Sequence, residues 1–517
     1  MKKTVFTFAA ALSLLAACKK SEDLEAPRLF RPQKAEELSA DSNTIVASWL
    51  RVAEARSYEV QLSRDTFKTV DATLTLDSNH AVFKKLRFNQ LYQVQVKALA
   101  PDSLKHSRWS YLGALKTLSS ILKVPAIDDI TMNSVRVRWT TKGAPVTSVK
   151  VIKTADSAVV ATADLTAADR ASESKILGGL EPGTEYTILM YSDADLRGDV
   201  PFRSKAPFSG VVINLTGITG RPNVLADTLP LIPAGSTVLL KRGETYTIAT
   251  GYSFDKSLVI MSGPDLATTA QAKLLFTSSW SFAGGANVDS VEFNDVYLYG
   301  DNVGSRYIFN NTNSANIGKL KFMNSRMEIF RGMVRLQSGT LNLGHLVINN
   351  SIVDSIGNYG MINIAASSKI DNITFTNSTF YKIEGVVASS SAANSVLIDN
   401  CTFNETPLGN NKNFYFDWGS QNVAAGITVS NCIFGTGKNS NNAFTVKGIR
   451  AGSATTIGTI NNYRTADYVS GGNDFTNSII SNRTSLQLWQ APASGDFKIM
   501  DATFPGRNTT GDPRWRP

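Results

Sequence analysis

The chain has 517 residues, enough for several domains with sizeable cores, and 43% of them are hydrophobic while 18% are charged. This balance, with abundant Asn, Ser, Thr and Gly, favours a β-rich extracellular protein and argues against a disordered chain. The net charge is +9, but the 52 basic and 43 acidic side chains are spread over both halves of the chain, which argues against a nucleic-acid partner.

The first 18 residues form an export signal. Lys2 and Lys3 precede an apolar stretch that is too short to remain as a membrane span. The stretch Leu15-Ala16-Ala17-Cys18 resembles the bacterial lipobox, which implies that Cys18 is lipidated; the alternative is an ordinary signal peptide with a chance cysteine. The polar segment 19–25 resembles the tether of Bacteroidetes-type surface lipoproteins. That resemblance implies attachment to the outer membrane through the lipid anchor alone, facing the cell exterior, although the sequence leaves the leaflet open.

Two similar segments, 26–118 and 119–205, follow. Each has short runs of alternating polar and apolar residues broken by polar turns, which predicts a β-sandwich. Trp49 in the first segment corresponds to Trp139 in the second, and Tyr92 corresponds to Tyr186. The phrase that ends in each tyrosine resembles the fibronectin type III fold, which implies that the tryptophan fills the core and the tyrosine closes a corner by a hydrogen bond. We interpret both domains as spacers, with ligand binding as the alternative.

A short phrase recurs through the rest of the chain, residues 206–517. Its fixed point is an asparagine followed by a small residue, with an aspartate fitting the first copy, and the steps of 29, 26, 27, 23 and 31 residues match one coil of a solenoid. The fixed points are Asp295, Asn324, Asn350, Asn377, Asn400 and Asn431. Residues four and two places before and three places after each of them are apolar. They can all face inward only if two strands meet in a tight turn at the asparagine, which tolerates left-handed backbone angles.

The amides at these turns, stacked about 4.8 Å apart, are expected to form a ladder that satisfies polar groups inside the turn. Three strands per coil with such a ladder resemble the right-handed parallel β-helix of pectate lyases. The closing residues GDPRWRP, from Gly511, resemble the end of uncharacterised β-helix lipoproteins that accompany polysaccharide-utilisation systems. The predicted fold is therefore all-β, two fibronectin type III-like sandwiches followed by a parallel β-helix with a C-terminal cap. Cys401 and Cys432 follow two of the asparagines, and we expect two buried thiols there, with a disulfide as the alternative.

One outward column of the β-helix is a candidate site. Four places after the fixed points lie Tyr299, Glu328, Asp354 and Tyr381. Two carboxylates on neighbouring strands repel unless a cation, a sugar hydroxyl or a shared proton compensates. The column is therefore a candidate glycan contact, with calcium as the one cofactor considered; an ordinary solvated face is the alternative.

A second set of candidates lies on the third strand of each coil. It comprises Arg335, Asn363, Asp417, Trp418 and Lys447. In the lyases that the fold resembles, this face carries the substrate groove with clustered calcium-binding acids. Here the carboxylates do not cluster, and the sequence motifs of polygalacturonases are absent. We therefore assign no catalytic residue.

Together these features predict a surface lipoprotein that binds polysaccharide without cleaving it. The fold resemblance and the positive charge favour pectin-like acidic glycans. Other proteins of a glycan-uptake system are the expected partners. A polysaccharide lyase with a divergent site and a structural or adhesive stalk are the alternatives.

Overall fold

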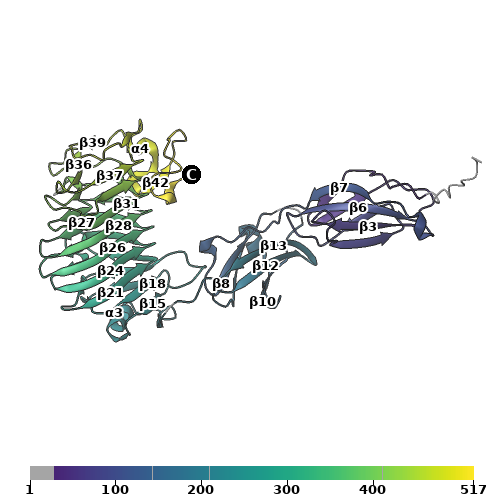
Figure 1. Ribbon diagram of the computed structural model, residues 1–517. Helices are drawn as coiled ribbons and strands as arrows, with labels where there is room; N and C mark the ends of the chain where they lie inside the picture. Colours follow the sequence, from purple (N-terminus) through teal and green to yellow (C-terminus); the bar gives the residue numbers. More distant parts are fainter. Residues whose placement is uncertain (1–27, 142–143, 209, 410–411) are drawn as a thin grey trace, which may run out of the picture. The chain divides into compact units, whose positions relative to one another are not determined.

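A computed structural model describes residues 28–141, 144–208, 210–409 and 412–517 (Figure 1). The predicted signal peptide, Cys18 and the tether 19–25 lie outside the described residues. The chain divides into two compact units between Pro207 and Phe208, close to the predicted start of the β-helix. None of the helices in the described part of the chain is long and apolar enough to cross a membrane.

The first sandwich pairs two antiparallel sheets. One sheet contains β1 (Ser39–Asp41), β2 (Thr44–Ser48) and β5 (His80–Phe83); the other contains β4 (Ala72–Leu76), β3 (Ser57–Ser63), β6 (Leu91–Leu99) and β7 (Ser110–Lys116) in that order. Trp49 is buried in the core, and the Tyr92 hydroxyl accepts a hydrogen bond from the Arg87 backbone N–H at 3.1 Å. The predicted core tryptophan and tyrosine corner are both confirmed.

The second sandwich repeats this arrangement. One sheet pairs β8 (Ser134–Arg138) with β11 (Ser174–Gly178); the other orders β10 (Val159–Asp164), β9 (Ser148–Lys153), β12 (Glu185–Ser192) and β13 (Asp195–Arg203), and the short helix α2 (Ala167–Ser172) connects the sheets. Trp139 is buried, and the Tyr186 hydroxyl accepts from the Glu181 backbone N–H at 2.8 Å. The equivalence that the sequence predicts between the two domains is thus confirmed.

The second unit is a parallel β-solenoid whose coils stack one above another (Figure 1). Before the corner asparagines lies a ten-stranded parallel sheet of β14 (Val212–Asn214), β15 (Ser236–Leu240), β18 (Leu258–Ser262), β21 (Asn287–Asn294), β24 (Ala315–Met323), β26 (Leu341–Asn349), β28 (Lys369–Thr376), β31 (Ser395–Asp399), β34 (Ile427–Ser430) and β37 (Ile457–Ile460). The strands that follow the corner form a second parallel sheet. They are β16 (Thr245–Ile248), β19 (Ala272–Phe276), β22 (Val296–Gly300), β25 (Arg326–Leu336), β27 (Ile352–Ile364), β29 (Thr379–Ile383), β32 (Thr402–Asn404), β35 (Ile433–Phe434), β38 (Tyr463–Arg464) and β40 (Ile479–Ile480). The solenoid predicted from the recurring asparagine is confirmed.

The third strands complete the coils. They are β17 (Ser253–Phe254), β20 (Ser281–Phe282), β23 (Tyr307–Asn311), the C-terminal halves of β25 and β27, β30 (Val387–Ser389), β33 (Phe414–Asp417), β36 (Thr445–Arg450) and β39 (Val469–Ser470). The helix α3 (Val224–Thr228) packs Val224 and Leu225 onto the first coils. The inward apolar residues of all three strands form one continuous core.

The predicted corner residues are left-handed. Their backbone φ angles lie between 48° and 55°, a region in which asparagine costs less than most residues, and they are Asp295, Asn324, Asn350, Asn377, Asn400 and Asn431. The apolar positions around them are buried, for example Leu320, Phe322 and Met327 on one coil. The corner is therefore built as its sequence period predicts.

The place of the amide ladder differs from the prediction. The Asn350 amide donates to the Asn324 side-chain oxygen at 2.8 Å, but both side chains are exposed on the outside of the corner. Asp295 pairs with Arg242, and the amides of Asn400 and Asn431 donate to Asp399, instead of joining the ladder. Inside the corner, the backbone N–H of Ser325 donates to Ser351 Oγ at 3.1 Å. In the same way, the backbone N–H of Ser351 donates to Ser378 Oγ on the next coil at 3.0 Å. The bend directs the asparagine outward and the following small residue inward, so the internal ladder is made of serine.

Cys401 and Cys432 occupy this inward position on later coils. Both are buried free thiols, which confirms the prediction of unbonded cysteines. Cys401 Sγ donates to the Asp399 carbonyl at 3.3 Å, as Ser351 Oγ donates to the Asn349 carbonyl at 2.8 Å. Burial raises the pKa of the Cys401 thiol. The two thiols therefore replace serine hydroxyls in the same structural role.

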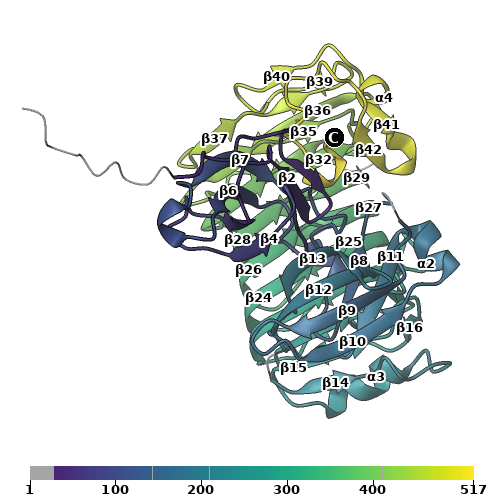
Figure 2. The ribbon, with the colours of Figure 1, turned by 90° about the vertical axis from the view of Figure 1, so that its right-hand side faces the viewer.

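Residues 485–517, here called the C-terminal strap, return along the side of the solenoid (Figure 2). The strap contains α4 (Ser485–Leu488), β41 (Trp489–Ala491) and β42 (Asp496–Ile499). Its apolar side chains pack on residues that point outward from the solenoid. These are Tyr381, Ile433 and Tyr463 on the solenoid and Leu488, Trp489, Phe497, Ile499 and Phe504 on the strap.

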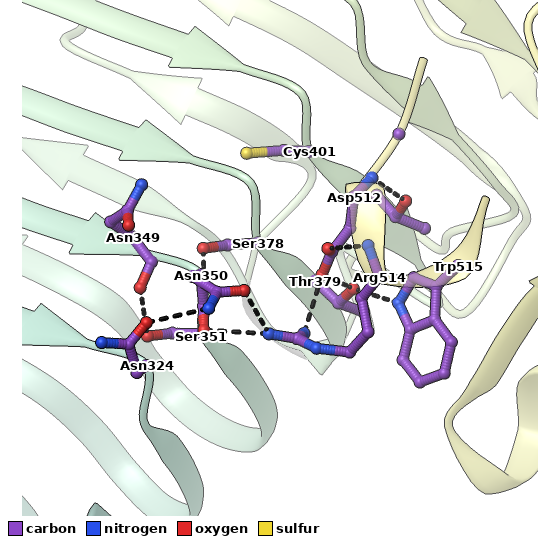
Figure 3. Close-up of polar contacts among 12 residues, drawn as sticks. Asn324, Asn349, Asn350, Ser351, Ser378, Thr379, Cys401, Asp512, Arg514 and Trp515 are labelled. Carbon is purple, nitrogen blue, oxygen red and sulfur yellow. Dashed lines mark hydrogen bonds and ion pairs between the residues drawn. The ribbon is translucent and has the colours of Figure 1, made fainter. Parts of the chain in front are cut away.

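The final residues of the strap bind the corner itself (Figure 3). Arg514 Nη2 donates to both the backbone and side-chain oxygens of Asn350, each at 2.9 Å, and Arg516 Nη2 donates to Asn400 Oδ1 at 2.5 Å. Thr379 Oγ1 donates to the buried Asp512 carboxylate at 2.7 Å and accepts from the indole of Trp515. The closing GDPRWRP motif thus bonds side chains of several coils and fastens them together.

Candidate functional site

The predicted outward column is aligned as expected but is not open to solvent along its length. Strand pairing places Tyr299 beside Glu328, Glu328 beside Asp354, and Asp354 beside Tyr381. Tyr381 is 5% exposed, because its ring packs against Phe497 of the C-terminal strap at 5.3 Å between centroids. The prediction that Tyr381 stacks on a sugar ring is therefore wrong; the strap occupies its face.

The two carboxylates of this column are compensated within the protein. Glu328 and Asp354 are 9% and 4% exposed, and Arg326 Nη2 lies 2.6 Å from Glu328 and 2.7 Å from Asp354. Burial, together with the neighbouring Glu328 carboxylate, raises the pKa of Asp354 to about 6. Although burial opposes it, hydrogen bonds from Tyr297 and Arg326 lower the pKa of Glu328. Arg326 thus supplies the positive charge that compensates the two carboxylates, a role for which calcium was the candidate.

No metal-binding cluster appears in the part of the chain that the structure describes. Across those residues, no three or more His, Cys, Asp or Glu side chains gather where they could hold an ion. Lys273 Nζ lies 3.8 Å from the Tyr299 ring centroid, so the open end of the column is aromatic and basic.

Some of the candidates on the third strands lie where they were predicted, and others do not. Arg335 pairs in register with Asn363, so these two lie side by side as predicted. Trp418 is 1% exposed and belongs to the solenoid core, and its predicted role as an outward sugar contact is wrong. Lys447 pairs with Phe414 and not with Asp417, because coils of different length shift the alignment. Arg450 takes that place and binds Asp417 through two hydrogen bonds of 2.7 and 2.6 Å.

Arg335 contacts a group of side chains that the sequence did not predict to lie together. The Arg335 guanidinium carbon lies 3.7 Å from the Tyr359 ring centroid, and that of Arg331 lies 4.7 Å from the same ring. Arg335 Nη1 also donates to the Tyr307 hydroxyl at 3.3 Å, and the two tyrosine rings meet edge to face. We call Tyr307, Arg331, Arg335 and Tyr359 the arginine–tyrosine cluster. Tyr307 is 4% exposed and serves to hold Arg335, whereas the other three side chains are half-buried and reach the surface.

A glycine makes room for this cluster. A Cβ atom at Gly332 would lie 3.1 Å from the Tyr359 Cβ and 3.2 Å from the Tyr307 ring. Gly332 pairs in register with both Tyr307 and Gly360 at the start of the third strands. The repeated phrases GMVRLQ and GMINIA each begin with these glycines, and this was the available sequence signal.

A pocket of about 580 Å³ adjoins the cluster at the bend between the second and third strands. Its charged lining residues are Arg331, Lys382, Glu384 and Glu405, with Ser355, Asn358 and Gly357 among the others. Ser355, Lys382 and Glu405 hold left-handed φ angles of 55°, 55° and 45°, so a second strained corner forms the pocket wall. This volume lies within the usual range of ligand sites, and Arg331 joins the pocket to the cluster.

Two family models match the solenoid, and both describe domains of unknown function. Domain of unknown function DUF4957 matches residues 244–383, which include the cluster, and domain of unknown function DUF5123 matches residues 396–515. No curated protein sequence matches the chain.

Solved structures of fibronectin domains resemble part of the chain. The FN1–FN3 domains of chicken CNTN1 share 15% identity over 35% of this chain and 68% of that chain, with a TM-score of 0.16. A segment of two fibronectin type III domains from chicken tenascin shares 20% identity over 34% of this chain and 99% of that chain, with a TM-score of 0.17. These values carry no functional argument; the strand order and the tyrosine corners describe the fold.

Proposed function

We propose that this protein binds polysaccharide at the cell surface through the arginine–tyrosine cluster and the adjoining pocket. The observation that carries the proposal is the packing of Arg335 and Arg331 on one tyrosine ring beside a pocket of about 580 Å³. Aromatic faces pack on the C–H faces of sugars, and guanidinium groups bind carboxylates through paired hydrogen bonds. An acidic, pectin-like glycan meets both kinds of contact.

The proposed ligand is acidic because the cluster carries two arginines and no carboxylate; Glu384 and Glu405 line the adjoining pocket, so the acid groups of the ligand are placed at the cluster. Its two arginines stand beside two tyrosines, while Glu328 and Asp354 on the neighbouring face are buried and bound to Arg326. Arginine presents a rigid planar fork to a carboxylate, and lysine does not. Substituting Arg335 by lysine should therefore weaken binding even though it keeps the charge.

The cellular setting belongs to the same proposal. Lipidation at Cys18 and an outer-membrane position facing the exterior rest on the sequence of residues 1–25. Partner proteins of a glycan-uptake system are proposed on the same ground. The sandwiches would then act as spacers between the anchor and the solenoid.

A second candidate function is cleavage of the same glycan by a divergent lyase. It is favoured by one observation: Arg331 and Lys382 line the pocket together with Glu384 and Glu405. A basic side chain in reach of a sugar proton could act as a general base. Absorbance of unsaturated products, followed with polygalacturonate in the presence and absence of calcium, distinguishes cleavage from binding.

Affinity electrophoresis in gels containing polygalacturonate tests the binding proposal. We expect retarded migration that Arg335→Ala and Tyr359→Ala each weaken by about tenfold, which corresponds to a loss of ~1.4 kcal/mol. Arg221→Ala is the matched control, because Arg221 is an exposed arginine paired with Asp227 near the first coils. Absence of retardation with any acidic glycan would instead favour a structural or adhesive stalk.

A further inference from the structure

The first sandwich carries aromatic side chains on the outer face of its four-stranded sheet. Tyr111 on the edge strand β7 is 58% exposed and pairs in register with Gln95 on β6. Trp109 immediately precedes β7, and Lys97 Nζ lies 4.6 Å from its ring centroid. The Tyr111 ring therefore offers an aromatic face to solvent beside Trp109, and such faces can pack on the C–H faces of sugars.

A row of amides and hydroxyls extends from these rings across the sheet. Gln95 Nε2 donates to Gln61 Oε1 at 2.9 Å, and Gln61 Nε2 donates to Glu59 Oε1 at 3.1 Å. Thr73 on the opposite edge strand pairs with Gln61 and is exposed. With strands about 4.8 Å apart, the row from Tyr111 to Thr73 spans about 14 Å, the width of a few sugar rings.

The charges in the central rows of this face cancel. Lys97 Nζ lies 2.7 Å from Glu59 Oε2, so the central rows present one neutral ion pair among amides and hydroxyls. A ligand that matches this face carries no net charge, offers hydroxyl groups for the amides and has apolar faces for the rings. A neutral polysaccharide has all three properties, and an acidic one would bring an uncompensated charge.

The second sandwich has a different row at the same place. The position three residues after each corner tyrosine is Gln95 in the first domain and Leu189 in the second. The register partners across the second sheet read Asp199, Leu189, Lys150 and Thr162, without an aromatic or an amide; in the next row Lys150 Nζ lies 5.2 Å from the Tyr191 ring centroid. The aromatic–amide row is therefore not a general feature of this fold in the chain.

We infer that the outer face of β4, β3, β6 and β7 binds a neutral polysaccharide chain that lies across the strands. Trp109 and Tyr111 pack on sugar rings at one edge. Gln95, Gln61 and Thr73 bond the sugar hydroxyls along the row. This site is independent of the acidic-glycan site proposed on the solenoid, and it gives the first sandwich a role beyond spacing.

Affinity electrophoresis of the full chain in gels containing mixed-linkage β-glucan, xyloglucan or galactomannan tests the inference. We expect retardation by at least one of these neutral glycans, weakened about tenfold by Tyr111→Ala and by Gln95→Ala. Tyr111 is exposed, so its variant should keep the fold, which an unchanged near-ultraviolet circular dichroism spectrum would establish. Leu189→Ala is the control in the second sandwich and should migrate as the unsubstituted protein does.

The outcomes separate this inference from the proposed function. Retardation by polygalacturonate should be the same with Tyr111→Ala, because that site lies on the solenoid. If no neutral glycan retards the protein, or if Tyr111→Ala and Gln95→Ala leave the retardation unchanged, the inference is overturned. If the Arg335→Ala variant loses binding to polygalacturonate but keeps binding to a neutral glycan, that result concerns the solenoid site and leaves the sandwich site unaffected.

Discussion

Nη2 of Arg326 lies 2.7 Å from Oδ2 of Asp354 on the next coil. The same nitrogen atom lies 2.6 Å from Glu328, so one guanidinium joins two carboxylates that strand stacking forces together. Where neighbouring coils pair in register, as they do here, an outward residue lies beside the residue at the same position of the next coil. Like charges in such a column require a partner, and here the partner stands two residues before the first acid.

Removing that partner should destabilise the solenoid. Arg326→Ala leaves two largely buried carboxylates without their cation, and we expect a loss of about 2 kcal/mol; the partial exposure of Arg326 keeps the loss below that of a fully buried pair. Thermal unfolding followed by circular dichroism checks this. The exposed Arg221→Ala should stay within about 0.5 kcal/mol of the unsubstituted protein. Equal melting temperatures for both variants would contradict the assigned role.

The same pair predicts a dependence of stability on pH. Because the pKa of Asp354 is raised to about 6, the folded chain binds a proton there that the unfolded chain has lost. Stability from this group is therefore greatest below its ordinary value of 3.8 and is lost as pH rises through about 6. The lowered pKa of Glu328 makes stability rise with pH instead. That stabilisation is already complete above the ordinary glutamate pKa of 4.5.

Melting temperatures measured between pH 4.5 and pH 7 isolate the Asp354 contribution. Asp354→Asn should flatten the decline across this window, because an amide does not titrate. A decline of unchanged slope in the variant would assign the effect to other groups.

The C-terminal strap should stabilise the coils that it crosses. Asp512→Ala removes the acceptor for Thr379 Oγ1 and for the exposed Arg514 guanidinium, which leaves the buried Thr379 hydroxyl without its acceptor and should cost about 2 kcal/mol. Ending the chain at residue 484 should go further and expose Tyr381 and Ile433, which increased binding of a hydrophobic dye would detect. Lys498→Ala, at an exposed site of the strap, is the control. If Asp512→Ala melts with the control, the strap does not fasten the coils.

The corner asparagines give a prediction about backbone conformation. Asn377 holds a φ of 52°, so Asn377→Ala should cost about 1 kcal/mol, whereas Asn377→Gly, which adopts such angles freely, should lie within about 0.5 kcal/mol of the unsubstituted protein. Denaturant unfolding of the two variants measures the difference. Equal losses for alanine and glycine would mean that the amide contacts, rather than the backbone angle, require asparagine.

The fold could be predicted from the sequence because its determinants are local and repeated. Each corner needs a residue that accepts left-handed angles, and inward strands need alternate apolar residues, so the period of the asparagines and the positions around them predict the coils. The core tryptophans and corner tyrosines of the sandwiches follow from local spacing in the same way. The free thiols of Cys401 and Cys432 also agree with the prediction, because they replace small inward residues.

The candidate site was less predictable because it depends on contacts between distant segments. The sequence pattern predicts that Tyr381 points outward, which it does. Its ring is buried because Phe497, more than 100 residues later in the strap, packs against it. Trp418 and Lys447 were misplaced because the third strands begin at different distances from the corner asparagine. Tyr359 and Tyr307 can both join the site because Gly332 on the neighbouring strand leaves room for the Tyr359 Cβ and for the Tyr307 ring.

Hydrogen–deuterium exchange of the full chain with saturating oligogalacturonides tests the central claim most directly. The account predicts slower exchange in residues 303–309, 331–336 and 356–363, which surround the arginine–tyrosine cluster and the pocket. The Arg335→Ala variant should lose that protection, and Arg221→Ala should keep it. Protection confined to another part of the solenoid, or no protection at saturating ligand, would contradict the account.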